Sequence, residues 1–240
     1  MGSLRSFPTV AFTIVMAFAP TLAHGQLPGE RAAFVERAAS QKWAMLIGVD
    51  EYIHVNKLKY CGSDVSALQE RLVGLGFPEA QTFLLHDGAK QRKNEPYKSN
   101  IDAVVETLLG KLSEDGKSLA QRGLVSRGDL VVVAFSGHGA HLDGTSYFCP
   151  IDARLNRADS LLSLERLYKL LALSPADVKL MLVDACRNDP RPGGVKDLKA
   201  TAESKKLAES LDKPPQGILV LSSCAPGQVS VEDPELGHGV

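Results

Sequence analysis

Several signatures of metal and disulfide proteins are missing from this chain of 240 residues. Its four cysteines form no CxxC pair, and its six histidines are scattered, with no HExxH motif and no paired Cys/His knuckle. Metal-ligand spacing is therefore absent, and we predict no metal and no other cofactor. The chain is also too large to need disulfide staples, so buried thiols are the default for Cys61, Cys149, Cys186 and Cys224.

Excess charge of either sign is missing too. The formal net charge is −1, which gives no electrostatic reason to expect nucleic acid or an anionic membrane surface as a partner. A hydrophobic content of 44% is ordinary for a globular protein, and the length suits one large α/β domain or at most two small ones. A small-molecule or polypeptide partner is the more natural expectation.

Only one segment of the chain is long and apolar. Residues 6–22 follow a short start that carries Arg5, and they end just before Ala23. This pattern predicts a signal peptide over residues 1–23, a spacer over residues 24–41, and export to the periplasm or the extracellular space. The alternative is an uncleaved membrane anchor, although Pro8 and Pro20 interrupt the apolar run. After cleavage, no integral membrane span is expected.

Apolar runs of strand type alternate with helical patterns along the rest of the chain. This alternation predicts an α/β fold with a mostly parallel central sheet covered by helices. A hairpin is expected around Asp143 and Gly144, and Ser99 or Asn100 is the expected N-cap of the second helix. The expected strands are 42–49, 82–85, 129–135, 178–183 and 217–221; the expected helices are 64–73, 101–109 and 163–173; a connector spans 189–216, with a short helix over 200–211.

Two chemically capable side chains lie where buried strands end. His138 follows the strand at 129–135, and Cys186 follows the strand at 178–183. Cys186 lies 48 residues after His138 in the sequence. Ligands gather at the carboxyl ends of parallel strands, so adjacent strands would bring the two side chains to one edge. An imidazole can activate a thiol by taking its proton and can then protonate a leaving amine. The pair predicts a cysteine nucleophile with a histidine base.

The motifs Ser136-Gly-His-Gly139 and Asp184-Ala-Cys-Arg187 resemble the two active-site motifs of the caspase-like cysteine peptidases, closest to the metacaspases and bacterial members. The resemblance extends over residues 42–240 and implies a caspase-like αβα sandwich. It implies that Cys186 is the nucleophile, that His138 is the general base and acid, and that the backbone N–H groups of Gly139 and Cys186 form the oxyanion hole. The substrate would be a polypeptide.

The neighbours of these motifs depart from the caspase pattern. Caspases carry a glutamine where this chain has Asp184, and an acidic residue there is typical of metacaspases, as is Cys61-Gly-Ser-Asp64. The resemblance implies that Cys61, Asp64, Ser136 and Asp184 line the pocket for the residue before the scissile bond. Two carboxylates favour Arg or Lys in that pocket and disfavour Asp. Asp64 is equally well explained as a carboxylate that stabilises a helix N-terminus.

Two further parts of the site are less specific. The resemblance implies that Ser222 and Ser223 help to hold the substrate backbone, although a plain turn after the fifth strand explains them as well. Some metacaspases bind calcium through clustered aspartates, but Asp143, Asp152 and Asp159 do not reproduce that clustering.

Seven basic side chains lie in the connector or just before it, so self-cleavage there is a hypothesis beside a plain solvated linker. They are Arg187, which precedes the connector, and Arg191, Lys196, Lys199, Lys205, Lys206 and Lys213 within it. Relatives continue beyond the position of Val240, so we expect a truncated C-terminal part that exposes a sheet edge, or a partner that covers it.

An inactive caspase-like binding module is the alternative to a peptidase. A serine hydrolase is poorly supported, because no GxSxG motif surrounds Ser136.

Overall fold

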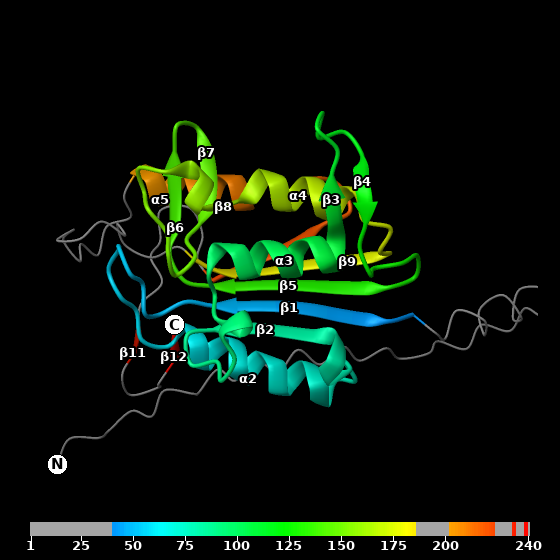
Figure 1. Cartoon of the computed structure of the whole chain (residues 1–240), viewed down its shortest axis with the longest axis horizontal. Coiled ribbons are helices and arrows are strands. Elements are labelled where there is room, and N and C mark those ends of the chain that lie inside the picture. Colours follow the sequence, from blue (N-terminus) through cyan, green and yellow to red (C-terminus); the bar gives the residue numbers. More distant parts are fainter. Residues whose placement is uncertain (1–39, 186–201, 224–231, 234–237, 240) are drawn as a thin grey trace, which may run out of the picture. The chain divides into compact units, whose positions relative to one another are not determined.

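A five-stranded parallel sheet forms the centre of the computed structural model, which describes residues 40–185, 202–223, 232–233 and 238–239. Side chains are described for residues 40–185 and 205–223. The strand order is β10-β9-β5-β1-β2, and each neighbouring pair is parallel (Figure 1). The strands are β1 Lys42–Gly48, β2 Thr82–His86, β5 Leu130–Ser136, β9 Val178–Asp184 and β10 Leu219–Ser222.

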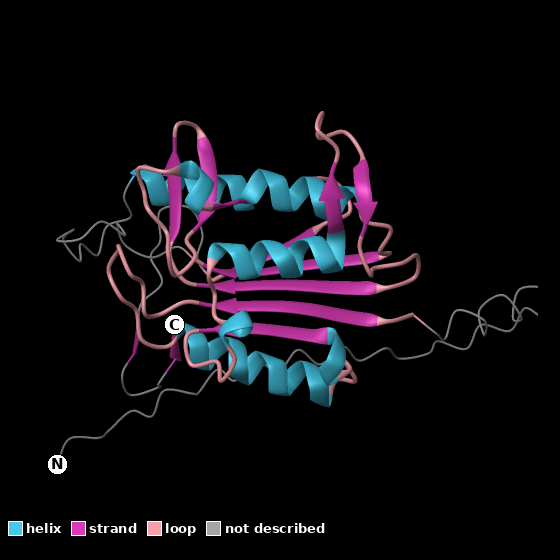
Figure 2. Ribbon diagram, in the orientation of Figure 1, coloured by secondary structure: helices cyan, strands magenta, loops and turns pink. Residues whose placement is uncertain are grey.

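Helices lie on both sides of this sheet, as Figure 2 shows in cyan. One helix, α2, packs against β1, β2 and β5 on one face, and the other three helices contribute to the hydrophobic cluster on the opposite face. The helices are α2 Cys61–Gly74, α3 Lys98–Leu109, α4 Leu164–Leu173 and α5 Ala202–Leu211. The arrangement confirms the predicted αβα sandwich.

The alternation of side chains along β1 explains the two layers of core. Ala44 and Leu46 belong to the cluster under α2, whereas Met45 and Ile47 belong to the larger cluster on the side of α3. All four side chains are buried, because successive residues of a strand point to opposite faces and both faces are covered. An unbroken apolar run is therefore the correct sequence for a central strand of this sheet.

Three small antiparallel sheets and three short 3-10 helices complete the described fold. The turn of the β6–β7 hairpin is made by Asp143 and Gly144, whose φ angles of 48° and 81° are those of a tight hairpin turn, as predicted. The remaining elements are β3 Gly110–Leu112, β4 Leu119–Arg122, β6 Gly139–Leu142, β7 Thr145–Phe148, β8 Leu162–Ser163, β11 Glu232–Asp233, β12 His238–Gly239, η1 Glu79–Gln81, η2 Arg92–Asn94 and η3 Ala158–Ser160.

The prediction of Ser99 or Asn100 as an N-cap is wrong. Helix α3 begins at Lys98, so both residues lie inside its first turn. The backbone N–H of Lys98 donates instead to Oδ1 of Asp152 at 2.9 Å. A carboxylate 54 residues away thus replaces a local cap.

The amino edge of the sheet is tied together by one buried carboxylate. Asp129 precedes β5 and is only 4% exposed. Its Oδ1 accepts the N–H of Gln41 at 2.9 Å, and its Oδ2 accepts the indole N–H of Trp43 at 3.0 Å and the N–H of Ser126 at 2.8 Å. Both oxygens are therefore satisfied, as burial of a charged group requires.

The sheet is less completely covered over its last two strands. Leu219 and Leu221 on β10 are 60% and 46% exposed, and Leu180 and Leu182 on β9 are only partly buried in the cluster under α2. Strand β10 also ends the strand order, so one of its sides has no neighbouring strand among the described residues. The described part of this edge of the sheet is thus apolar and partly exposed.

Candidate active site

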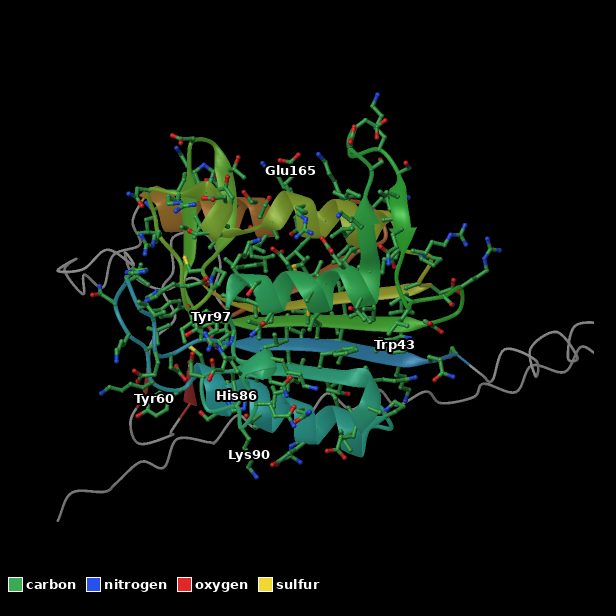
Figure 3. All side chains as sticks on the ribbon, viewed as in Figure 1. Trp43, Tyr60, His86, Lys90, Tyr97 and Glu165 are labelled. Atoms are coloured by element: carbon green, nitrogen blue, oxygen red, sulfur yellow. The ribbon has the colours of Figure 1, made fainter. Side chains whose placement is uncertain are left out.

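The carboxyl ends of the parallel strands meet at one edge of the sheet. Gly48 of β1 pairs with Ser136 of β5, and Ser136 pairs with Asp184 of β9. Ser222 of β10 pairs with Val183, one residue before Asp184. Figure 3 shows this edge opposite the one where Trp43 is labelled, with His86 at the end of β2. The register therefore brings Ser136, Asp184 and Ser222 to one rim.

His138 lies just past this rim, between β5 and β6, and is only 2% exposed. Its backbone N–H donates to the hydroxyl oxygen of Tyr52 at 2.7 Å. The two rings also lie together, with centroids 4.9 Å apart and planes tilted by 40°. The imidazole is thus enclosed by the protein and oriented by the segment that follows β1.

The tautomer of His138 follows from a second contact with the same segment. Its Nε2 lies 2.8 Å from the carbonyl oxygen of Asn56. A carbonyl oxygen can only accept a hydrogen bond, so Nε2 must carry a proton. The neutral ring then has its lone pair on Nδ1, which is the nitrogen able to take a proton from an acid. Sequence reasoning missed this contact, because any residue at position 56 offers the same carbonyl.

Gly139 occupies a position at which its N–H points away from the hairpin. It pairs with Phe148, and Cys149 N–H donates to the carbonyl oxygen of His138 at 2.9 Å. That bond identifies Gly139 and Phe148 as a non-hydrogen-bonded pair of the antiparallel ladder. The backbone N–H of Gly139 is therefore not used by β7, which suits the oxyanion role that we predict for it.

Helix α5 packs directly on Gly139. A Cβ built on Gly139 would overlap with Cδ2 of Leu207 and would lie 3.1 Å from the carbonyl oxygen of Ala185. Leu207 is buried, and α5 makes extensive contact with β6. A side chain at position 139 would therefore require the buried Leu207 side chain to move.

Cys186 lies outside the described residues, so its predicted roles as nucleophile and oxyanion donor stay predictions. Ala185, the residue before it, is described and buried, and its carbonyl oxygen lies beside Gly139. The described segment 40–185 therefore ends one residue before Cys186, next to the proposed oxyanion position.

Hydrogen bonds hold the carboxylate of Asp184 in the rim. Ser223 Oγ donates to its Oδ1 at 2.7 Å, and Ser136 Oγ donates to its Oδ2 at 3.4 Å. The backbone joins the same strands, because Gly137 N–H donates to the carbonyl oxygen of Asp184 at 3.0 Å. Three of the predicted binding residues, Ser136, Asp184 and Ser223, are thus in direct contact, and Ser222 precedes Ser223 on β10.

Cys61 and Asp64 lie in the first turn of α2, and Cys61 contacts the end of β1. The backbone N–H groups of Cys61 and Gly62 donate to the two oxygens of Asp50 at 2.9 and 2.8 Å. Cys61 is fully buried, and a Cβ on Gly48 would overlap with its carbonyl oxygen. Asp64 is half-buried in the first turn, so both the pocket role and the helix-terminus role that we considered remain compatible with its position.

A further carboxylate, Asp87, lies at the same edge after β2. Its Oδ2 accepts the backbone N–H groups of Asp50 and Glu51, the latter at 3.1 Å. Its Oδ1 is buried without a hydrogen-bond partner among the described residues. Burial raises the pKa of Asp87, and the two N–H donors only partly oppose this effect.

Within residues 40–185 and 205–223, His, Cys, Asp and Glu side chains form no group of three or more that could hold a metal ion. None of the described helices has the length and apolar character needed to span a bilayer.

The parallel αβα sandwich has a histidine just past the end of one central strand and, in the sequence, a cysteine just after the next. Residues 41–238 match the model of the caspase domain family, peptidase family C14, and the chain belongs to that family. The predicted membership of the caspase-like family is thereby confirmed.

The comparisons with solved structures and with curated proteins add nothing to this family assignment. A crystal structure of a Geobacter sulfurreducens protein aligns with a TM-score of 0.49 and 16% sequence identity, over 80% of this chain and 76% of that one. A search of curated proteins found no match to this chain.

Proposed function

We propose that this chain is a cysteine endopeptidase in which Cys186 is the nucleophile and His138 is the general base and acid. The observation that carries the proposal is the contact between His138 Nε2 and the carbonyl oxygen of Asn56. It leaves Nδ1 as the basic nitrogen, and burial keeps the ring in one orientation. A free cysteine is only a few per cent thiolate at neutral pH, so it needs such a base.

The reaction has two halves. In the first, Nδ1 of His138 takes the thiol proton, the sulfur attacks the peptide carbonyl carbon, and the C–N bond breaks as His138 protonates the leaving amine. In the second, a water molecule gives its proton to His138 and attacks the thioester, which releases the acid and restores the thiol. The backbone N–H groups of Gly139 and Cys186 would stabilise the oxyanion in both halves.

The substrate preference that we propose is Arg or Lys before the scissile bond, as in metacaspases. Ser136 and Ser223 orient the Asp184 carboxylate, which can pair with a guanidinium or ammonium group. Asp64 from α2 and Cys61 would complete the pocket. An Asp side chain would meet negative charge there and would be excluded.

Fluorogenic peptides with Arg, Lys or Asp before the reporter group test this proposal. We expect hydrolysis of the Arg and Lys peptides, little of the Asp peptide, and a loss of at least about a thousandfold in Cys186→Ala and His138→Ala. His141→Ala is a matched control, because His141 lies on the same hairpin and its Nδ1 lies 3.0 Å from Ser146 Oγ. No turnover of any peptide by folded wild type would instead favour the inactive binding module.

The positions of the basic residues limit which of them we propose as self-cleavage sites in the connector. Lys205 and Lys206 lie within α5, and a helical segment cannot enter a protease groove as an extended strand. Lys213 is followed by Pro214, which has no N–H and resists cleavage at that bond. We therefore propose the basic residues of 187–199, which lie outside the described residues. Bands of equal size from wild type and Cys186→Ala would contradict self-cleavage.

The N-terminal region lies outside the described residues, and its role is also a proposal. We propose that residues 1–23 direct export and are removed, that 24–41 form a spacer, and that residues 42–240 form the catalytic domain. A mature N-terminus near residue 24, found by mass spectrometry of the exported protein, would support this. A protein that retains residue 1 in the membrane fraction would favour an anchor.

A further inference from the structure

The segment between β1 and α2 contacts His138 at three points. Tyr52 accepts the backbone N–H of His138 at 2.7 Å, its ring lies 4.9 Å from the imidazole, and the Asn56 carbonyl oxygen lies 2.8 Å from Nε2. These residues are 86 and 82 positions away from His138 in the sequence. The backbone and the ring of one buried histidine are therefore held by a single distant segment.

Tyr52 is firmly placed. It is 2% exposed, and burial raises the pKa of its hydroxyl well above the ordinary value, so the group is a neutral phenol at physiological pH. The next residue, Ile53, donates its N–H to the carbonyl oxygen of Ile151 at 2.9 Å. The hydroxyl oxygen is thus a fixed, neutral acceptor.

Gly137 leaves the space that the Tyr52 hydroxyl occupies. A Cβ on Gly137 would lie 2.5 Å from the hydroxyl oxygen and 3.1 Å from Cζ of Phe135. Real Cβ atoms do not approach that closely, so a side chain at position 137 would displace the hydroxyl. The glycine before His138 and the tyrosine opposite it fit one another.

We propose that Tyr52 is a positioning residue for His138, an inference that rests on the proposed peptidase function. Its hydroxyl satisfies a backbone N–H that would otherwise be buried without an acceptor, and its ring limits rotation of the imidazole. The side chain of His138 then stays on the Asn56 carbonyl, and Nδ1 keeps one direction. A phenylalanine would fill the same core space but would release the histidine backbone.

Kinetics of Tyr52→Phe test the inference. We expect kcat on an Arg peptide to fall about tenfold while KM stays within about twofold, because the substrate pocket is unchanged and only the base is misplaced. Tyr168→Phe is the matched control, since its hydroxyl bonds the carbonyl oxygen of Ser210 at 3.4 Å on the α4–α5 side and should leave kcat unaltered. An unchanged kcat in Tyr52→Phe, or an equal loss in the control, would overturn the inference.

A second variant reaches the same contact from the other side. Gly137→Ala should displace the hydroxyl and lower kcat to a similar extent, and adding it to Tyr52→Phe should lower kcat by less than the product of the two single effects. Fully multiplicative losses would show that the two residues do not act through one contact. Thermal melting of each variant separates loss of fold from loss of positioning.

The imidazole itself can be observed without any turnover. In ¹⁵N spectra of the histidine rings, His138, assigned with a His138→Gln variant, should show a protonated Nε2 that exchanges slowly, and Tyr52→Phe should broaden or shift it. A changed spectrum in a protein that cleaves nothing would leave the positioning inference standing and refute the peptidase proposal. An unchanged spectrum in Tyr52→Phe would refute the positioning inference even if wild type is active.

Discussion

The carboxylates at the two opposite edges of the sheet have different surroundings. At the amino edge, Asp129 accepts three N–H groups, and both of its oxygens are satisfied. At the carboxyl edge, Asp87 keeps one buried oxygen without a partner among the described residues, and Asp184 accepts hydrogen bonds from two serine hydroxyls. The amino edge thus uses its carboxylate to join segments through N–H donors, whereas the carboxyl edge places its carboxylates where the strands end.

The difference indicates that the residues which stabilise the fold lie at one edge of the sheet and the residues available for catalysis lie at the other. Backbone and indole N–H groups satisfy Asp129 completely, so a substrate would add nothing there. At the carboxyl edge, strand ends are the places where backbone groups leave the ladder and can face a ligand. Substitutions at the amino edge should therefore alter folding, and substitutions at the carboxyl edge should alter catalysis.

The largest effect is expected at the carboxyl edge. Asp184→Asn keeps the size and removes the charge, and it can still bond Ser136 and Ser223 if one of the two serine hydroxyls accepts from the new amide NH2. We expect kcat/KM for Arg peptides to fall by about thirtyfold to several thousandfold, since losing one partner of a desolvated charge pair costs about 2–5 kcal/mol. The melting temperature should change little. A variant with full Arg activity would show that Asp184 does not bind the basic side chain.

The amino edge should give the opposite result. Asp129→Ala leaves the N–H groups of Gln41 and Ser126 and the indole N–H of Trp43 without an acceptor, so we expect a loss of about 2–4 kcal/mol in the free energy of unfolding. Urea denaturation followed by Trp43 fluorescence measures it, because Trp43 is the one tryptophan of the chain. The folded fraction should keep wild-type kcat. Wild-type stability would remove the contrast between the two edges.

A smaller effect is expected where α5 meets β6. The Cβ of Gly139→Ala would overlap with Leu207, so we expect a loss of about 1–3 kcal/mol from overpacking. Adding Leu207→Ala makes room, and the pair should lose less stability than the two single losses combined. Additive losses in denaturant melts would mean that the backbone, not Leu207, excludes a side chain at position 139.

The smallest effect is a pH dependence. Burial raises the pKa of Asp87 in the folded state above its unfolded value of about 3.9. The folded state therefore holds this proton more tightly, and the stabilisation is complete below the unfolded pKa and is lost as pH rises through the folded pKa. Asp87→Asn should lack this decline. Melting curves of both proteins between about pH 3.5 and 7 would show it, and parallel curves would contradict it.

The sequence predicted the strands and their carboxyl rim well, because buried parallel strands are unbroken apolar runs that end at polar residues. It did not predict the β3–β4 hairpin, whose short strands include the exposed polar residues Lys111, Gln121 and Arg122 and carry little periodic signal. Three of the site residues, Ser136, Asp184 and Ser223, were predicted and do meet. Their predicted roles still await experiment.

The contacts that sequence reasoning missed share one physical cause. Helices α2 and α3 are capped by Asp50 and Asp152, which belong to other segments, so local capping rules failed at α3. His138 is held by the backbone of Asn56 and the hydroxyl of Tyr52, both more than 80 residues away. Contacts of this kind depend on the folded path of the chain and leave no periodic pattern.

The packing of α5 has a consequence for a severed chain. Leu207, Ala208 and Leu211 are buried, and β10 beyond them is hydrogen-bonded to β9 within the central sheet. A cut anywhere between residues 187 and 201 would therefore produce two polypeptides that share one hydrophobic core and one sheet. They would separate on a denaturing gel and elute together from a sizing column, so this single chain can become a heterodimer without any assembly step.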